Sequence, residues 1–307
     1  MKQRQELSSP GLLKIARSHF TDCVKDVRSH PQIDFKVQDA LMSGLAIFSF
    51  KYPSLLQFDL ATRSETPVAH NLRTLYSVQN PMSDTQIREI IDPLNPREIR
   101  DVYKKVFTAV QRGKLLEQFI YMNDSYLVAL DGTSHFSSKT VHCERCCQKK
   151  HRDGSITYHH QMLSGVLVHP QKKAVIPFAP EPILKQDGRK KNDCERNAAE
   201  RFLEDLRREH PHLKLIVTED GLGSNAPPID TLKRHNMNFI LGCKPGDNTA
   251  LFAFLEGSEK IGAVSHIGIQ DGELIHRFRW MHSVPLNDSR SDCVVNFIEY
   301  WEIKDGQ

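Results

Sequence analysis

The 307-residue sequence predicts a mixed α/β fold, with a mixed sheet flanked by helices, a helical region before it and a β-rich insertion interrupting it. Three observations predict this fold class. Apolar residues recur at helical spacing through about the first 120 residues. Beyond Asn123, short runs of β-branched and apolar residues alternate with amphipathic helical patterns. From residue 246 onward, several short strand-like runs are separated by turns.

The N-terminal region contains three helical patterns. Phe35–Phe50 has an apolar stripe at helical spacing, and Ser83–Pro93 is typical of a capped short helix stopped by proline. Asn95 and Pro96 open a further helix that we expect to reach about Tyr121. Two helices joined by a short turn are compatible with a DNA-reading pair. An ordinary helical bundle is the simpler interpretation, because the pattern has no specific residue signature.

The predicted sheet has five strands in the order strand, strand, strand, helix, strand, helix, strand. Three hairpin-connected strands followed by alternating helix and strand predict a mixed sheet. The expected strands are Ser125–Leu130, Tyr158–His169, Lys173–Phe178, Leu213–Val217 and Asn238–Leu241. The expected helices are Asp193–Glu209 and Ile229–Arg234.

The C-terminal region is expected to be an all-β insertion that follows the fifth strand. Its strand-like runs are Ile261–Ile267, Leu274–Trp280 and Val294–Ile303. The chain therefore divides into a helical region at 1–122 with possible DNA binding, a core at 123–245 and a β-rich insertion at 246–307.

Composition excludes several classes of protein. A hydrophobic content of 39% and a charged content of 26% predict a packed core. The net charge of +3 is mildly basic and neither requires nor excludes nucleic acid. The N-terminus has no apolar signal segment, and the longest apolar run, Leu41–Phe50, is too short to span a bilayer. We therefore expect a cytoplasmic protein without a membrane partner.

Two aspartates stand at equivalent places in the predicted sheet. Asp131 follows the first strand, and Asp220 follows the fourth, which in this strand order lies beside the first. Carboxylates at adjacent strand ends can converge on Mg²⁺ or Mn²⁺, and two such ions can clamp a phosphodiester. Asp-Gly pairs are also common turn formers. Because both aspartates follow apolar strands, the metal interpretation is favoured.

A second cluster lies between the first two predicted strands. The seven cysteines are an odd number, so thiols or metal ligands are expected rather than disulfides. Cys143 and Cys146, with His151, have the spacing of a zinc knuckle that lacks one ligand. Cys194 or His160 could supply the fourth donor to a structural Zn²⁺. The alternative is a set of reduced cysteines in a histidine-rich loop.

Two basic runs in connections of the core could contact DNA phosphates, although short runs of this kind are often only solvated loop charge. They are Lys149, Lys150 and Arg152, and Arg189, Lys190 and Lys191.

The segment 126–245 resembles bacterial insertion-sequence DDE transposases, which have a ribonuclease H-like catalytic core. The matching stretches are VALDGTSHFSS, YHHQMLSGVLVHP, VIPFAPEPI, NDCERNAAERFL, LKLIVTEDGLGSNAP and MNFILGCKPGD. The resemblance implies that Asp131 and Asp220 are the first two catalytic carboxylates. It further implies metal-dependent DNA cleavage and strand transfer at the ends of a mobile element. Its partners would be double-stranded DNA, as element ends and target, and a second copy of the chain in a homodimer on DNA.

The sequence departs from this family at the third carboxylate. The family's glutamate on a helix after the insertion has no counterpart here, because Glu299 and Glu302 lie on a predicted strand. The expectation is a C-terminally truncated transposase that is inactive in this form. The alternatives are a non-catalytic DNA-binding remnant and a zinc-stabilised regulatory DNA-binding protein, in which the Asp-Gly pairs are turns.

Overall fold

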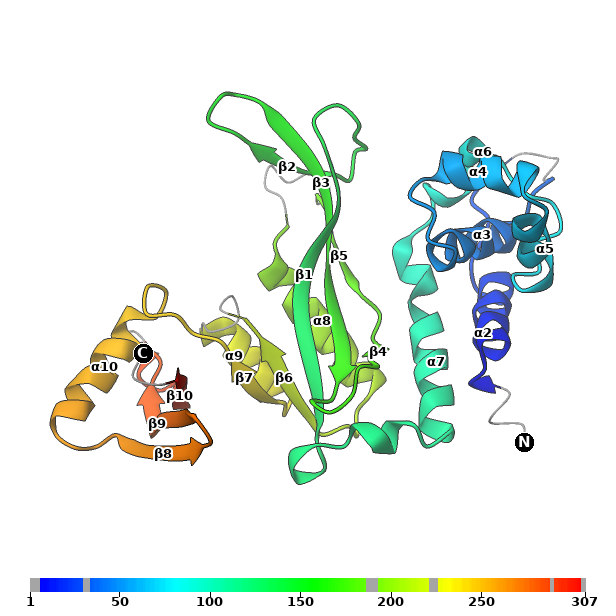
Figure 1. Ribbon diagram of the computed structural model, residues 1–307. Helices are drawn as coiled ribbons and strands as arrows, with labels where there is room; N and C mark the ends of the chain where they lie inside the picture. The colour runs from blue at the N-terminus through cyan, green and yellow to red at the C-terminus, as the bar shows by residue number, and fades with distance from the viewer. Residues whose placement is uncertain (1–5, 30–33, 186–192, 221–225, 288–289, 305–307) are drawn as a thin grey trace. The chain divides into compact units, whose positions relative to one another are not determined.

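The computed structural model describes residues 6–29, 34–185, 193–220, 226–287 and 290–304. The chain forms two compact units. The first comprises residues 1–126 and 164–182, and the second comprises 127–163 and 183–307. Figure 1 labels the elements along the chain.

The first unit is mainly helical, as the sequence predicted. Its centre is apolar, and Met42, Phe58 and Leu72 are each at most 1% exposed there. Its α-helices are α2 (Ser9–Asp22), α3 (Val37–Ser49), α4 (Leu55–Ser64), α5 (Thr66–Thr74), α6 (Asp84–Ile91) and α7 (Arg100–Arg112). Short 3₁₀ turns are η1 (Pro96–Ile99), η2 (Leu116–Phe119) and η3 (Met122–Asp124).

The capped helix predicted after Ser83 is present, but the next helix is shorter than predicted. The Ser83 side chain accepts a hydrogen bond from the Gln86 amide, and the Gln86 side chain accepts one from the Ser83 amide. The prediction of one helix from Pro96 to Tyr121 was wrong. It begins as a 3₁₀ turn, and α7 ends at Arg112 because Lys114 has a left-handed backbone, with φ of 60°.

The main sheet is mixed, which confirms the predicted α/β fold class. Its principal strand order is β2-β3-β1-β6-β7, and β4 and β5 also pair with β3. The β2–β3 and β3–β4 pairs are antiparallel, whereas β6 and β7 are parallel. The strands are β1 (Tyr126–Ser138), β2 (Cys147–Lys150), β3 (Ile156–Val168), β4 (Ile176–Pro177), β5 (Glu181–Ile183), β6 (Leu215–Glu219) and β7 (Asn238–Leu241).

The predicted neighbours β1 and β6 are adjacent in the sheet. The Thr218 hydroxyl of β6 donates a hydrogen bond to the Val128 carbonyl of β1 at 3.5 Å. However, β1 does not end before Asp131 as predicted, since it continues to Ser138. Asp131 therefore lies within a long strand whose first part is buried and whose second part is largely exposed.

Two helices follow the hairpin strands of the second unit. They are α8 (Glu195–Glu209) and α9 (Ala226–Arg234). Helix α8 buries one face, with Ala198, Phe202 and Leu206 almost inaccessible. That periodic stripe produces the amphipathic pattern from which the helix was predicted.

The C-terminal region is β-rich but contains a helix that the sequence analysis missed. The helix is α10 (Thr249–Lys260), and Leu251 and Leu255 are its buried face. The three-stranded antiparallel sheet β10-β9-β8 follows, made of β8 (Ser265–Asp271), β9 (Leu274–Pro285) and β10 (Val294–Lys304). The expectation of an all-β insertion was therefore wrong at α10.

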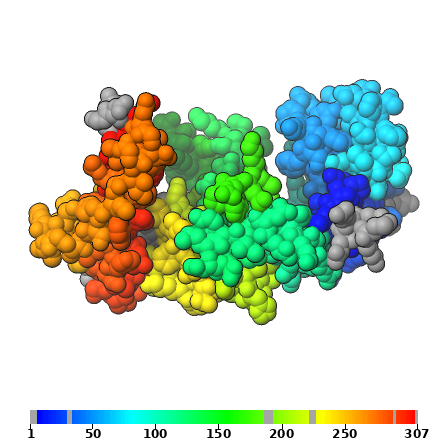
Figure 2. Space-filling view, turned by 60° about the horizontal axis from the view of Figure 1, so that its bottom comes forward, coloured from blue at the N-terminus to red at the C-terminus, as the bar shows by residue number. Residues whose placement is uncertain are grey.

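The small sheet has an exposed apolar surface. Ile267, Ile298 and Tyr300 are each about half exposed or more. Figure 2 draws this C-terminal segment in orange to red. Within the described residues, no helix has both the length and the apolar character needed to cross a membrane.

Candidate functional site

Four carboxylates gather in the second unit at strands β1 and β6 and the start of helix α8. Asp131 is an exposed residue of β1, and Asp220 is the exposed residue that follows β6. Glu219 is the last residue of β6 and is partly buried, and Glu195 is the first residue of α8. The sequence analysis named the two aspartates and missed both glutamates.

Glu195 approaches the backbone of β1 directly beside Asp131. A Cβ atom placed on Gly132 would overlap the end of the Glu195 side chain. The Glu195 side chain thus occupies the space that a side chain at position 132 would take. Helix α8, which positions Glu195, was correctly predicted from the sequence.

Within this acidic cluster, Glu219 responds both to its burial and to the neighbouring acids. Burial, followed by the fields of Asp220, Glu195 and Asp131, raises the pKa of Glu219 to about 7. Neighbouring carboxylates disfavour each other's ionised forms unless a cation offsets their charge. Carboxylate oxygens are the donor type that a hard divalent cation such as Mg²⁺ prefers. Among the described residues, however, no three of these acids have ligand atoms that all lie within 4.8 Å of one another.

A cavity of about 440 Å³ lies beside two of these acids. Glu195 and Glu219 form part of its wall, and Lys149 of β2 and His159 of β3 form another part. Asp193 also lines it, but the Asp193 carboxylate is 2.6 Å from the Arg201 guanidinium. Although burial opposes ionisation, hydrogen bonds from Arg201 and Asn197 lower the pKa of Asp193, so this acid already has its cationic partner.

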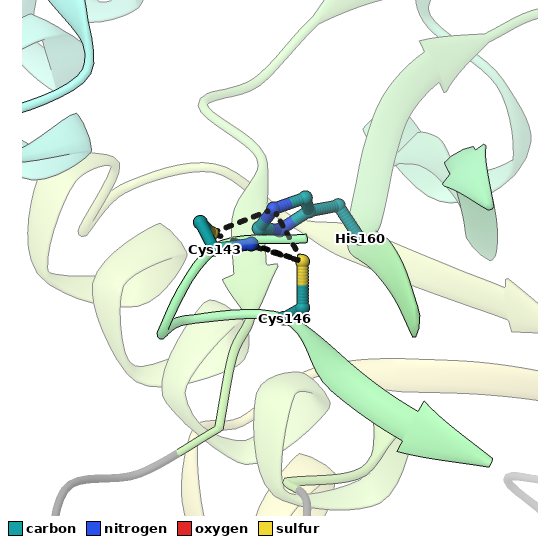
Figure 3. Close-up of side chains that lie close together, drawn as sticks. All are labelled: Cys143, Cys146 and His160. Atoms are coloured by element: carbon teal, nitrogen blue, oxygen red, sulfur yellow. Dashed lines mark hydrogen bonds between the residues drawn. The ribbon is translucent and has the colours of Figure 1, made fainter. Parts of the chain in front are cut away.

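A separate thiol–imidazole cluster is formed by Cys143, Cys146 and His160 (Figure 3). The two Sγ atoms are 3.7 Å apart, and each lies 3.3 Å from Nε2 of His160. Burial, together with the nearby His135 and His159, lowers the pKa of His160 and favours its neutral form. Neutral imidazole is the form that binds a metal ion.

Local backbone structure explains how the two thiols meet. The Cys146 amide donates to the Cys143 carbonyl at 3.2 Å, which closes a turn with a cysteine at each end. The Cys143 amide in turn points at the Cys146 sulfur at 3.3 Å. His160 reaches the cluster from β3. The residue after Cys146, Cys147, pairs with the residue before His160, His159, and this is the first pair between β2 and β3.

The structure brings His160, and not His151, to the two thiols. The His151 Nε2 atom instead lies 2.7 Å from the Thr157 hydroxyl. Cys194, the other candidate for a fourth donor, is the exposed N-cap residue of α8 and is not part of the cluster.

The structure describes one of the two basic runs that the sequence analysis proposed as DNA contacts. Lys149 and Lys150 are exposed on strand β2 rather than in a loop, and Arg152 is exposed in the turn after it. Arg189, Lys190 and Lys191 lie outside the described residues.

No protein-family model matches the chain, and no curated protein matches it. Among solved structures, the chain is similar to a piggyBac transposase synaptic complex with hairpin DNA, with 15% identity and a TM-score of 0.37. That match covers 93% of this chain and 56% of the piggyBac chain, so this chain spans little more than half of its length. A pre-cleavage Mos1 transpososome is also similar, with 13% identity, a TM-score of 0.20, and coverage of 76% of this chain and 68% of that one.

Proposed function

We propose that this chain is a DNA transposase that performs metal-dependent phosphodiester cleavage and strand transfer at the ends of a mobile element. The observation that carries the proposal is the gathering of Asp131, Asp220 and Glu195 around Glu219. These acids come from two adjacent strands and the start of helix α8, whereas the resemblance to DDE transposases implied a third acid on a helix after the β-rich insertion. Carboxylates that converge on one site can bind divalent cations at a phosphodiester, and the charges of these three acids all act on the Glu219 carboxyl.

Asp131 and Asp220 are the proposed ligands of Mg²⁺ or Mn²⁺. Both side chains are exposed, so a DNA backbone can approach them from solvent. When bound, the metal would activate a water or 3′-hydroxyl and offset the charge of the leaving oxygen. The more buried Glu219 is not proposed as a metal ligand; it adds negative charge next to the ligands when it is ionised.

Glu195 is the proposed third carboxylate. The sequence predicted instead a third acid on a helix after the β-rich insertion and, without it, an inactive chain, and that expectation remains a prediction. The closeness of the Glu195 side chain to the backbone of Gly132, the neighbour of Asp131, supports the role proposed for Glu195.

Double-stranded DNA is the proposed partner. The exposed Lys149, Lys150 and Arg152 carry positive charge on and after β2, and Lys149 lines the cavity beside Glu195. Such side chains position a duplex through its phosphates without reading its sequence. The second basic run, Arg189–Lys191, is proposed to act in the same way. A homodimer on DNA is proposed from the resemblance to DDE transposases. The domain boundaries at residues 122 and 245 are proposed from the sequence.

The test is cleavage of linear duplex DNA carrying the sequences that flank the chain's own gene, with Mg²⁺ or Mn²⁺. The native chain should nick this DNA, and the variants Asp131→Asn, Asp220→Asn and Glu195→Gln should not. Asp271→Asn is a matched control, because Asp271 is 83% exposed on the small sheet and far along the chain from the acids. DNA binding without metal-dependent cleavage by the native chain would contradict the catalytic proposal and favour a DNA-binding role.

A further inference from the structure

The cluster of Cys143, Cys146 and His160 lies in the second unit and shares no residue with the acidic cluster. We infer that it is a Zn²⁺ site, in which the metal clips the turn 143–146 to strand β3. Among the described histidine, cysteine, aspartate and glutamate residues, these three are the one group whose ligand atoms all lie within 4.8 Å of one another.

The distances between the donor atoms fit a tetrahedral zinc ion. With Zn–S of about 2.3 Å and Zn–N of about 2.0–2.1 Å, tetrahedral angles require about 3.8 Å between sulfurs and about 3.6 Å between sulfur and nitrogen. The observed separations are 3.7 Å for the Sγ pair and 3.3 Å for each Sγ to Nε2 of His160. Three edges of the tetrahedron are thus in place to within about 0.3 Å.

Hydrogen bonding alone does not account for this triangle. Nε2 of a neutral imidazole offers either one hydrogen or one lone pair. Both the Cys143 and Cys146 sulfurs nevertheless lie 3.3 Å from that single atom, as Figure 3 shows. A cation between the three atoms would satisfy both sulfurs and the nitrogen at once.

The donor set also separates this site chemically from the acidic cluster. Two thiolates and an imidazole are soft to borderline donors, which favour Zn²⁺ over Mg²⁺. The backbone amide of Cys143 points at the Cys146 sulfur at 3.3 Å and would stabilise its thiolate form. His135 of β1 stacks on the ring of His160 with ring centroids 5.9 Å apart, and the fourth position of the zinc is left to water or another donor.

The position of the site indicates what the zinc does. The turn 143–146 and the first residue of β2 already have two contacts with residues 183–185. The Lys185 amide donates a hydrogen bond to the Arg145 carbonyl, and the Cys147 thiol contacts the Ile183 carbonyl. Zinc would fix the turn to β3 as well. The hairpin β2–β3 carries Lys149 along the wall of the cavity, so the clip would set the position of that wall.

The test measures zinc in the purified full chain and, after replacement by Co²⁺, its visible absorption. We expect about one zinc per chain and a cobalt spectrum with thiolate charge-transfer and tetrahedral bands. Cys143→Ser, Cys146→Ser and His160→Ala should each lose the metal. Cys194→Ser and His151→Asn are matched controls that should keep it.

Because Cys143 is exposed, its replacement by serine should leave the fold intact, which circular dichroism can verify. Absence of zinc from the native chain, even after zinc is added, would overturn the inference. Retention of the metal by well-folded Cys143→Ser and His160→Ala chains would overturn it as well. Asp131→Asn and Asp220→Asn should keep full zinc, so failure of the catalytic proposal leaves this result unchanged.

Discussion

The carboxylate of Glu195 lies against the backbone of Gly132, the residue that follows Asp131 in strand β1. This contact joins the start of helix α8 to a residue of β1 that lies 63 positions earlier in the chain. The contact brings the proposed third acid next to Asp131. A Cβ atom at position 132 would overlap the end of the Glu195 side chain, which would then have to move.

Gly132→Ala should therefore displace Glu195 and reduce metal-dependent DNA cleavage. We expect a loss of at least about 10-fold, comparable to the loss of a partner that orients a metal ligand. Gly246→Ala is the control, since no atom lies within 4 Å of a Cβ built there. Equal cleavage rates for the two variants would show that glycine at position 132 is not needed to position Glu195 for the reaction.

Removing a direct ligand should weaken metal binding more strongly. Asp131→Asn and Asp220→Asn should each lower the affinity for Mn²⁺ by at least about 100-fold, because even outer partners of metal ligands contribute about 10–100-fold. Isothermal titration of Mn²⁺ against the native chain and both variants measures this directly. Unchanged affinity in both variants would remove the two aspartates from the metal site.

Glu219 should make the metal-free fold sensitive to pH. Its folded pKa of about 7 lies above the ordinary 4.5, so folding opposes its ionisation, and the resulting loss of stability grows as pH rises from about 4.5 to 7. Glu219→Gln should then stabilise the chain by on the order of 1–2 kcal/mol at pH 8, after allowance for partial exposure of the group. The gain should vanish near pH 4. Urea unfolding in EDTA at both pH values checks this, and a gain independent of pH would contradict the crowding of the four acids.

The zinc clip should contribute to stability. A strong zinc chelator should lower the thermal midpoint of the native chain by several degrees. A ligand whose free concentration is 100 times its Kd stabilises the folded state by about 2.7 kcal/mol, and the chelator removes this stabilisation. The midpoint of Cys143→Ser should not respond to the chelator. Differential scanning calorimetry compares the two chains, and an equal response in both would place the chelated metal elsewhere.

The cap of α6 gives a test of the helical unit that is independent of either site. Ser83→Ala removes one half of the capping box, because the Ser83 Oγ atom accepts a hydrogen bond from the Gln86 amide at 3.2 Å. We expect a loss of about 1 kcal/mol in the free energy of unfolding. Ser49→Ala is the control, because its hydroxyl donates only to the Leu45 carbonyl on an exposed face. A difference of less than a few tenths between the two would mean that the cap is not formed.

The parts of the fold with strong local patterns were predictable from the sequence. The capping residues at Ser83 and the periodic apolar face of α8 fix their helices locally, and both helices are present. The adjacency of β1 and β6 followed from the order of strands and helices. In contrast, the length of β1 was not predictable, because Asp131-Gly132 is a turn signal that the sheet pairing overrides.

The composition of the sites depended on long-range contacts that sequence spacing does not encode. His151 has the spacing of a zinc ligand, but its imidazole lies beside the Thr157 hydroxyl, and His160 reaches the cysteines across the strand pairing. Glu195 was overlooked because its proximity to Asp131 depends on the packing of α8 at Gly132. Glu195 precedes Asp220 in the chain, whereas the resemblance implied a third acid after the β-rich insertion.

The most direct test of the central claim is the cleavage of gene-flanking duplex DNA by the native chain and by Glu195→Gln, in the presence of Mn²⁺ and again in EDTA. We predict metal-dependent nicking by the native chain, none in EDTA, and a loss of at least about 100-fold in the variant. Nicking by Glu195→Gln at the native rate, with Asp131→Asn inactive, would show that another carboxylate completes the site. No metal-dependent cleavage by a folded native chain would contradict the proposed catalytic function itself.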